Sequence, residues 1–361
     1  MGRRERIVNL KLQFRLTIGR ILCYNLPRRG RDSDDYQRKT AGASGNAEWG
    51  LSVRQCNSKK AGDHPGCCLE IIRQLESDGF ELEAMTNRGY RLGERNDMLT
   101  EAGIRRELGD KASLFTLEVF DTITSTNTVM KERADALPEW HVIVSASQTA
   151  GRGRTGRSFY SPSDSGVYLS VLLHPVLPAA EATRITTAAA VAACRAIEAC
   201  TDAKPEIKWV NDVFVKGKKV CGILTEGSLN METGGLDWAV MGIGLNVYEP
   251  KEGFPDDIRQ IAGPIADTRR KNLRNALVAS FLVSFHEICI DLTRADFAEE
   301  YRKRSFLLGQ DILVLKSDGA VPAVALDVDD ECRLVVQYEN GNREALSSGE
   351  VSVRPAERII K

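Results

Sequence analysis

Short apolar strands outnumber helices between residues 114 and 248, and this grouping constrains the fold more than any other feature of the chain. Two helices are predicted there, at 127–137 and 181–200. The predicted strands are 114–122, 141–147, 166–173, 206–215, 219–229 and 238–248. Strands that alternate one for one with helices are typical of parallel, doubly wound sheets. This order instead favours an α+β domain around a central mixed or antiparallel sheet.

The later part of the chain predicts one more helix and a separate β unit. Apolar residues recur on one helical face at about 272–293. From residue 309 the pattern becomes all strand, with hairpin signals at 317–319 and 340–341. We therefore expect a small closed or partly closed β-barrel over 306–361.

The first quarter of the chain has a different character. Residues 1–66 show no sustained hydrophobic period and hold 14 lysines and arginines against 6 acidic residues, which indicates a disordered or atypical basic segment. A helix at 69–79 and a hairpin over 80–92 predict the back half of a winged helix within 67–95. The front half of that fold is not recognisable. Residues 96–305 would then form the ligand-binding domain.

Composition excludes several classes of protein. The formal net charge is −1, so the chain as a whole is not built to coat nucleic acid, although its basic start is a candidate arm for DNA. No run of 18 apolar residues is present, so we expect no membrane helix, and the start lacks the apolar run of a signal peptide. Nine cysteines without a C-x-x-C pair favour a reduced, cytoplasmic setting.

The segment GRGRTGR, residues 151–157, is the strongest chemical signal. Its glycines let the backbone approach a ligand and move between open and closed states. Its arginines match the oxygens of phosphates and carboxylates. The loop follows a strand directly, where ligand loops tend to lie. A flexible basic surface loop would look the same in isolation, and the spacing is not that of a P-loop.

The segment KWVND, residues 208–212, carries groups suited to a nucleotide. Trp209 can stack on a flat ring, and Asn211 and Asp212 can fix polar groups or a metal-bound phosphate. Lys219 begins the next strand, so we expect its ammonium across the hairpin from this cluster. An ordinary hairpin with solvated lysines is the alternative.

The segment TSTN, residues 124–127, places hydroxyl and amide groups at a predicted helix start. There they can bind an anion or a ureido group together with free backbone N–H groups, although a plain N-cap needs the same residues. In order along the chain stand STN, QTAGRGRTGR, KWVND, KVCGILTE and GIGLNV. Together these motifs resemble the biotin protein ligase family over about residues 69–361.

The resemblance implies a fold, a reaction and a set of site residues. The fold would be a class II synthetase-like catalytic domain with a small C-terminal barrel and a degraded N-terminal winged helix. The enzyme would form biotinyl-5′-AMP from biotin and ATP with Mg²⁺, and transfer biotin to a lysine of a biotin carboxyl carrier protein. The implied biotin-binding residues are Ser125, Thr126, Asn127, Gln148, Arg152, Gly153, Arg154 and Lys219. The implied ATP- and adenylate-binding residues are Arg154, Arg157, Trp209, Asn211, Asp212 and Asn246.

The implied chemistry needs no enzyme nucleophile. Catalysis should come from alignment and from cations placed where charge develops. We assign Lys219 and Arg154 to the α-phosphate and the biotin carboxylate, and we expect Asp212 to help hold Mg²⁺. The arginine loop and Lys219 should therefore converge on one acyl-phosphate. Val210 stands where the family usually has proline, a change that removes no polar group.

Two other functions remain open at the level of sequence. A lipoate or octanoyl ligase would share the fold but not the arginine-glycine loop. A biotin-responsive DNA-binding repressor is favoured by the basic start and the hairpin. Pro65 and Gly66 would interrupt a helix-turn-helix, which argues against retained DNA binding and suggests an altered reading frame or a foreign upstream segment. A homodimer is compatible with the sequence.

Overall fold

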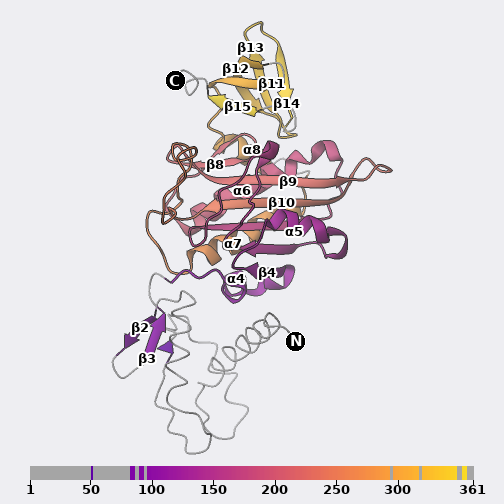
Figure 1. The fold of residues 1–361 in the computed structure, drawn as a ribbon. Coiled ribbons are helices and arrows are strands. Elements are labelled where there is room, and N and C mark those ends of the chain that lie inside the picture. Colours follow the sequence, from indigo (N-terminus) through magenta and orange to yellow (C-terminus); the bar gives the residue numbers. More distant parts are fainter. Residues whose placement is uncertain are drawn as a thin grey trace, which may run out of the picture. The chain divides into compact units, whose positions relative to one another are not determined.

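A computed structural model describes the greater part of the chain, which divides into two compact units, Met1–Gly93 and Glu94–Lys361. The described residues are 50–51, 82–85, 89–92, 96–292, 296–316, 319–347 and 352–355. The larger unit contains a seven-stranded sheet with its helices and a separate five-stranded sheet (Figure 1).

The described part of the smaller unit is a three-stranded antiparallel sheet with strand order β1-β3-β2. β2 (Leu82–Met85) and β3 (Gly89–Leu92) pair as the predicted hairpin. β1 (Gly50–Leu51) pairs with β3, although we expected no regular structure in that segment. The helix predicted at 69–79 and the tip of the hairpin lie outside the described residues.

The central sheet of the larger unit has the strand order β4-β5-β6-β10-β9-β8-β7. β4 and β5 are parallel, and the other neighbours are antiparallel, so the predicted mixed sheet is confirmed. The strands are β4 (Thr116–Phe120), β5 (His141–Ser145), β6 (Gly166–Leu173), β7 (Glu206–Lys208), β8 (Asp212–Val215), β9 (Lys218–Leu229) and β10 (Leu236–Asn246).

One strand prediction, 206–215, is wrong, because this segment is a hairpin. β7 and β8 pair antiparallel with Lys208 opposite Asp212, so the chain reverses between them. The turn contains neither glycine nor proline, the usual marks of a reversal. It is held from outside, where the Tyr301 hydroxyl donates to the Val210 carbonyl at 3.2 Å. The Trp209–Val210 peptide bond is cis.

The helices predicted at 127–137, 181–200 and 272–293 are confirmed with shifted ends. α4 and α8 were not predicted, because both are short and largely polar. The helices are α4 (Glu101–Leu108), α5 (Thr126–Arg133), α6 (Thr183–Cys200), α7 (Leu273–Cys289) and α8 (Asp296–Arg304), and the 3₁₀ turns are η1 (Gly109–Leu114), η2 (Ala134–Ala136), η3 (Arg154–Gly156) and η4 (Ala179–Glu181). In the described part of the chain no helix has both the length and the apolar character needed to cross a membrane.

The two faces of the central sheet carry different helices (Figure 1). Met241 and Ile243 of β10 belong to the main core, which α6 and α7 cover. Val240 belongs to a smaller cluster with Leu172 and Met130 of α5 on the other face. Side chains alternate between the faces of a strand, so neighbouring residues of β10 serve different layers.

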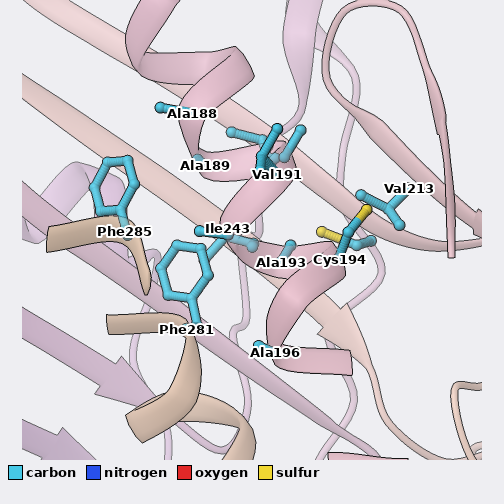
Figure 2. Close-up of a cluster of buried hydrophobic side chains, with 14 of the residues drawn as sticks. Ala188, Ala189, Val191, Ala193, Cys194, Ala196, Val213, Ile243, Phe281 and Phe285 are labelled. Atoms are coloured by element: carbon cyan, nitrogen blue, oxygen red, sulfur yellow. The ribbon is translucent and has the colours of Figure 1, made fainter. Parts of the chain in front are cut away.

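Small side chains let α6 and α7 pack closely over the sheet. Ala189 and Ala193 of α6 are fully buried. Ile243 of β10 belongs to the same core and is 4% exposed. Phe281 and Phe285 of α7 stack with ring centroids 5.5 Å apart. Figure 2 shows these side chains together in one apolar layer. Because protein interiors are close-packed, the large rings of one helix fill the room that the alanines of the other leave.

A buried ionic network ties the start of the larger unit to α7. The side chains of Asp97 and Arg274 are 0% and 3% exposed. Asp97 Oδ1 accepts from the Arg274 backbone N–H at 2.9 Å, and Asp97 Oδ2 accepts from the Tyr248 hydroxyl at 2.6 Å. The Arg274 guanidinium also donates to the Asp97 carbonyl. Each charge is therefore paired within the core, as a buried charge requires.

A second ionic network lies at the β4 edge of the sheet. Glu118 accepts two hydrogen bonds from the Arg133 guanidinium, at 2.6 and 3.1 Å, and His141 Nε2 lies 2.7 Å from its carboxylate. The hydrogen bond from Arg133 holds the pKa of Glu118 below its usual value, although burial opposes it.

The C-terminal strands form one antiparallel sheet with the order β14-β13-β12-β11-β15, the C-terminal sheet domain. Its described strands do not close into a ring, because β14 and β15 pair only with their inner neighbours. The predicted turn at 340–341 joins β13 and β14, with Gly341 at φ 82°. The turn at 317–319 lies mostly outside the described residues. The strands are β11 (Asp311–Lys316), β12 (Gly319–Val328), β13 (Leu334–Tyr338), β14 (Arg343–Leu346) and β15 (Ser352–Pro355).

Candidate active site

A pocket lies at the end of α5, on the α5 side of the central sheet, and it gathers almost every residue that the sequence singled out. Asn246 does not line it; its Nδ2 donates to the Lys219 carbonyl at 3.4 Å. The predicted residues that line the pocket are Ser125, Thr126, Asn127, Gln148, Arg152, Gly153, Arg154, Arg157, Trp209, Asn211, Asp212 and Lys219.

The N-terminus of α5 forms one end of the pocket. Ser125 is the N-cap, and its hydroxyl accepts from the Thr128 N–H at 3.4 Å, so this residue does cap the helix. Thr126 donates from its backbone N–H and its hydroxyl to Gln148 Oε1, at 2.9 and 3.3 Å. Gln148 Nε2 donates to the Ser161 hydroxyl at 3.0 Å. Both ends of the Gln148 amide are thus fixed.

Asn127 is held by a second, partly buried network, which Ser170 links to Thr126 at 2.8 Å. The Ser170 hydroxyl donates to Asn127 Oδ1 at 2.6 Å, and Asn127 Nδ2 donates to the Leu224 carbonyl at 3.2 Å and to Glu226 Oε2 at 3.0 Å. Lys131 lies 2.6 Å from Glu226. Burial works to raise the pKa of Glu226, but hydrogen bonds from Lys131 and Asn127 outweigh it and hold the pKa below its usual value. An ionised Glu226 therefore orients the amide.

Three glycines of β9 and β10 form the floor of the pocket. A Cβ atom on Gly242 would lie 1.9 Å from Asn127 Oδ1. A Cβ atom on Gly244 or Gly222 would lie 2.4 or 2.9 Å from the ring of Phe159. No other residue type fits such close approaches without displacing its neighbour. These residues, Gly222, Gly242 and Gly244, are called the glycine floor.

The arginine loop folds back on itself as a tight turn. The Gly153 N–H donates to the Arg157 carbonyl at 2.7 Å, and the Arg157 N–H donates to the Arg154 carbonyl at 3.1 Å. Thr155 and Gly156 take positive φ angles of 52° and 74°. Glycine adopts such angles at no steric cost, which explains why residue 156 is a glycine.

The first two arginines of the loop have fixed partners. Arg152 lies 3.3 Å from Glu226, so it reaches the network around Asn127. Arg154 donates to Asn211 Oδ1 at 3.1 Å. Burial lowers the pKa of Arg154 and the nearby Asp212 opposes this, yet a guanidinium stays protonated in proteins. Arg157 is exposed at the rim.

Lys219 and Asp212 form an ion pair at the end of the pocket opposite Asn127. Lys219 Nζ lies 2.6 Å from Asp212 Oδ1, and both side chains are about one quarter exposed, at 27% and 22%. The same Oδ1 atom is buried, so the Lys219 ammonium is its partner in the pocket. The neighbouring Lys218 points elsewhere and donates to the carbonyls of Arg259 and Gln260.

Several lining residues were given no role by the sequence analysis, although six of them lie within the motifs KVCGILTE and GIGLNV. Glycine inside a strand marks a close approach of other atoms, and this signal would have pointed to the glycine floor. Phe159 carried no signal beyond its place two residues after the arginine loop, and Lys208 stood within KWVND without a role. The missed residues are Thr155, Ser158, Phe159, Lys208, Gly222, Ile223, Leu224, Gly242, Ile243 and Gly244.

The pocket therefore has two chemically different ends. The α5 end offers oriented hydroxyl and amide groups, and the other end offers the cations Arg154 and Lys219 beside Asp212. Among the described residues that line the pocket there is neither a cysteine nor a histidine. Within the described ranges no three His, Cys, Asp or Glu side chains gather as a metal site would require. Such a pocket can bind a neutral polar group and an anion at once, and act by alignment and charge.

Comparisons with known proteins match two parts of the chain to family models. Residues 119–246 match the model of the Biotin/lipoate A/B protein ligase family, and residues 307–354 match the Biotin protein ligase C terminal domain. These ranges correspond to most of the central sheet and to the C-terminal sheet domain.

Whole-chain relatives agree with the family models. The bifunctional ligase/repressor BirA of Bacillus spizizenii is 30% identical over 301 residues, which cover 81% of this chain and 92% of the relative. The biotin–[acetyl-CoA-carboxylase] ligase of Mycobacterium tuberculosis is 30% identical over 264 residues, 70% of this chain and 95% of that protein. The biotin protein ligase of Aquifex aeolicus, solved with biotin and ATP, shares the fold with a TM-score of 0.54 at 24% identity, over 67% of this chain and 99% of that one.

Proposed function

The chain belongs to the biotin protein ligase family, and we propose that its pocket joins biotin to ATP and then passes the biotinyl group to a lysine of a carrier protein. One observation carries the assignment of residues: the arginine loop and Lys219 line the same pocket as the α5 end. A ligand that spans the pocket would meet neutral polar groups at one end and cations at the other.

The α5 end suits the ureido ring of biotin. A ureido group has one carbonyl acceptor and two N–H donors, so it needs donors and acceptors at fixed positions. Ser125, Thr126, Asn127 and Gln148 offer hydroxyl and amide groups that are buried or half-buried and already oriented. Preorganised partners of this kind lower the entropy cost of binding. The glycine floor lets the side chains of Asn127 and Phe159 lie close against the sheet, where they face the pocket.

The cationic end suits the first chemical step. An oxygen of the biotin carboxylate attacks the α-phosphorus of ATP, and the bond to the β-phosphate oxygen breaks as pyrophosphate leaves. We assign Arg154 and Lys219 to the α-phosphate oxygens and the carboxylate, where they lower the repulsion between two anions and stabilise the developing charge. Arg157 at the rim and Asn211 beside Arg154 are placed to meet the remaining phosphates or the ribose.

The second step uses the same alignment. The neutral amine of a carrier lysine attacks the acyl carbon of biotinyl-5′-AMP, the bond to the phosphate oxygen breaks, AMP leaves and the amine loses a proton. Closure of the arginine loop over the mixed anhydride would keep water from it. The relative from Mycobacterium tuberculosis is named for acetyl-CoA carboxylase, so the biotin carboxyl carrier domain of that enzyme is the carrier we propose.

Asp212 fits a role in holding Mg²⁺. Its side chain lines the pocket, and the Lys219 ammonium, 2.6 Å from Oδ1, is the cation that a metal ion would replace. Mg²⁺ in nucleotide sites is commonly held by one or two carboxylates together with phosphate oxygens and water. A bound Mg²⁺ would neutralise charge on the leaving pyrophosphate. Lys219 would then turn from Asp212 toward the α-phosphate.

A second candidate function is DNA binding in a biotin-responsive repressor. The observation that favours it is the small β1-β3-β2 sheet, whose β2–β3 hairpin matches the wing of a winged helix. The relative from Bacillus spizizenii is named as a ligase and repressor. A gel shift with operator-like DNA, with and without biotin and ATP, tests this function separately. A homodimer also stays a prediction.

The ligase function is tested by mass spectrometry of a biotin carboxyl carrier domain incubated with the protein, ATP and one acid. With biotin, we expect the mass of one biotinyl group on one lysine. With octanoate or lipoate at the same concentration we expect no change in the mass of the carrier domain. The alkyl end of octanoate and the dithiolane ring of lipoate offer no hydrogen-bond partner to the amide groups of the α5 end. A product with octanoate alone would assign the chain to the lipoate branch instead.

A further inference from the structure

Trp209 lines the pocket, but its indole N–H is directed at the C-terminal sheet domain. Its side chain is 4% exposed, and its indole N–H donates to the carbonyl of Cys332 at 3.0 Å. Cys332 lies in the turn between β12 and β13 of the C-terminal sheet domain. A ring covered in this way offers little surface for stacking on a nucleotide base.

The backbone beside Trp209 is also held from behind. The Tyr301 hydroxyl of α8, itself fully buried, donates to the Val210 carbonyl at 3.2 Å. The next residue faces the other way, since Asn211 accepts from Arg154 at 3.1 Å. The Asn211 backbone and side chain exchange hydrogen bonds with Ile223 of β9 at 2.9 and 3.0 Å. Trp209 and Val210 are therefore held by the C-terminal sheet domain and α8, whereas the next two residues, Asn211 and Asp212, contact charged residues of the pocket.

The turn that presents the Cys332 carbonyl is itself well defined. Asp329 Oδ1 accepts from the backbone N–H groups of Glu331 and Arg333, at 3.0 and 2.9 Å, and the Cys332 N–H donates to the Asp329 carbonyl at 2.9 Å. Cys332 takes a φ of 61° and is fully buried. The Asp329 carboxylate thus fixes the position of an acceptor that is needed by the other domain.

We propose that Trp209 is a positioning residue through which the C-terminal sheet domain sets the nucleotide end of the pocket. The indole ties the turn of residues 209–211 to the Cys332 carbonyl, and the same turn aims Asn211 at Arg154 and Asp212 at Lys219. The α5 end depends on other contacts, those of Asn127 and Gln148. Loosening the tie should therefore affect ATP more than biotin. This inference rests on the proposed ligase function.

The first test removes the indole N–H. Trp209→Phe keeps an aromatic ring and loses the donor, and Trp238→Phe is the matched control, because its indole N–H donates to Asp135 at an exposed site outside the pocket. KM for ATP is measured by pyrophosphate exchange, and biotin affinity without ATP by calorimetry. We expect KM for ATP to rise about tenfold in Trp209→Phe, the effect of one lost buried hydrogen bond, with biotin affinity within about twofold. Trp238→Phe should match the wild type.

The second test acts from the other domain and leaves the pocket sequence intact. Asp329→Ala removes the cap of the Cys332 turn, whereas Asp329→Asn keeps the acceptor oxygen. Asn340→Ala removes a like cap from the β13–β14 turn, where Asn340 accepts from the Asn342 N–H at 3.0 Å. We expect a rise of about threefold in KM for ATP for Asp329→Ala alone. Rescue by asparagine would show that the turn, and not the charge, matters.

The outcomes separate the inference from the function it rests on. Equal effects of Asp329→Ala and Asn340→Ala, or an equal loss of ATP and biotin affinity in Trp209→Phe, would overturn the inference while wild-type ligation stood. A wild-type protein that makes no biotinyl-5′-AMP would overturn the function itself. If Trp209→Phe does not fold, the three variants in the C-terminal sheet domain still decide the question.

Discussion

Gly242→Ala should weaken biotin binding through Asn127, a residue that the new methyl group would strike. The added carbon would lie 1.9 Å from Asn127 Oδ1, so the amide has to move by about 1.5 Å to reach an ordinary contact of 3.4 Å. Such a shift breaks the bond from Ser170 and strains those to Leu224 and Glu226. At about 1 kcal/mol for each of two or three hydrogen bonds, the loss is about 2–3 kcal/mol.

A loss of this size lowers biotin affinity about 30-fold to 150-fold. Calorimetric titration of biotin without ATP measures it directly, because the nucleotide end takes no part. Gly235→Ala is the matched control. It lies just before the same strand, its φ is not positive, and its new Cβ would meet the Leu177 carbonyl and the Thr233 hydroxyl at an ordinary 3.4 Å.

The reasoning also predicts non-additivity. In an Asn127→Ala background the clash is gone, so Gly242→Ala should cost less than about threefold more. Full additivity would show that the methyl group acts by another route. Wild-type affinity in Gly242→Ala, or an equal loss in Gly235→Ala, would refute the role given to the glycine floor.

Three further predictions address the catalytic cation, the core and pH. Lys219→Ala should slow biotinyl-5′-AMP formation about 10²–10³-fold in a pyrophosphate-exchange assay, as removal of one preorganised donor does; Lys218→Ala should stay near wild type, and equal losses would contradict the assignment. Asp97→Ala removes the buried carboxylate beside Arg274 and leaves the more exposed Asp164, 3.4 Å away, as its acidic partner, so the free energy of unfolding in urea should fall by about 3–5 kcal/mol; an unchanged midpoint would mean that Asp164 alone compensates the charge. The pKa of Glu118 is lower in the folded chain than its ordinary value, so its carboxylate stabilises the fold at neutral pH and loses this effect as pH falls through the folded pKa. Glu118→Gln should therefore destabilise the protein at pH 7 and by less below about pH 4, and a difference in urea midpoint that is the same at both pH values would contradict this.

The sheet could be predicted from sequence because its strands are apolar runs with recognisable ends. β6 coincides with the predicted 166–173, since it is buried on both faces. The segment 206–215 failed for a different reason. Its turn is stabilised by Tyr301 and by the Cys332 carbonyl, residues far along the chain, and no local residue marks it. Contacts of this kind exist only after the helices and the C-terminal sheet domain have packed.

The candidate site was predicted better at its motifs than at its supports. The arginine loop and KWVND stand out because several special residues are adjacent in sequence. Phe159 acts through position alone, over the glycine floor, and a single phenylalanine carries no signal; Glu226 ends the motif KVCGILTE, but its place behind Asn127 needed the fold. For Trp209 the residue was found, but the direction of its indole N–H needed the fold.

The alternation along β10 has a consequence for how insertions and deletions are tolerated. If β10 shifted its register by one residue, Met241 and Ile243 would point into the pocket. Gly242 and Gly244 would then face the core and leave cavities beneath the helices. A single register shift would therefore impair both ligand recognition and stability. The only irregularity in the pairing of β10 with β9 lies at its beginning, between Leu236 and Trp238. An insertion or deletion in the β9–β10 connection can be absorbed at this irregularity. The connection can therefore vary in length while the register of the pocket-lining part of β10 is kept.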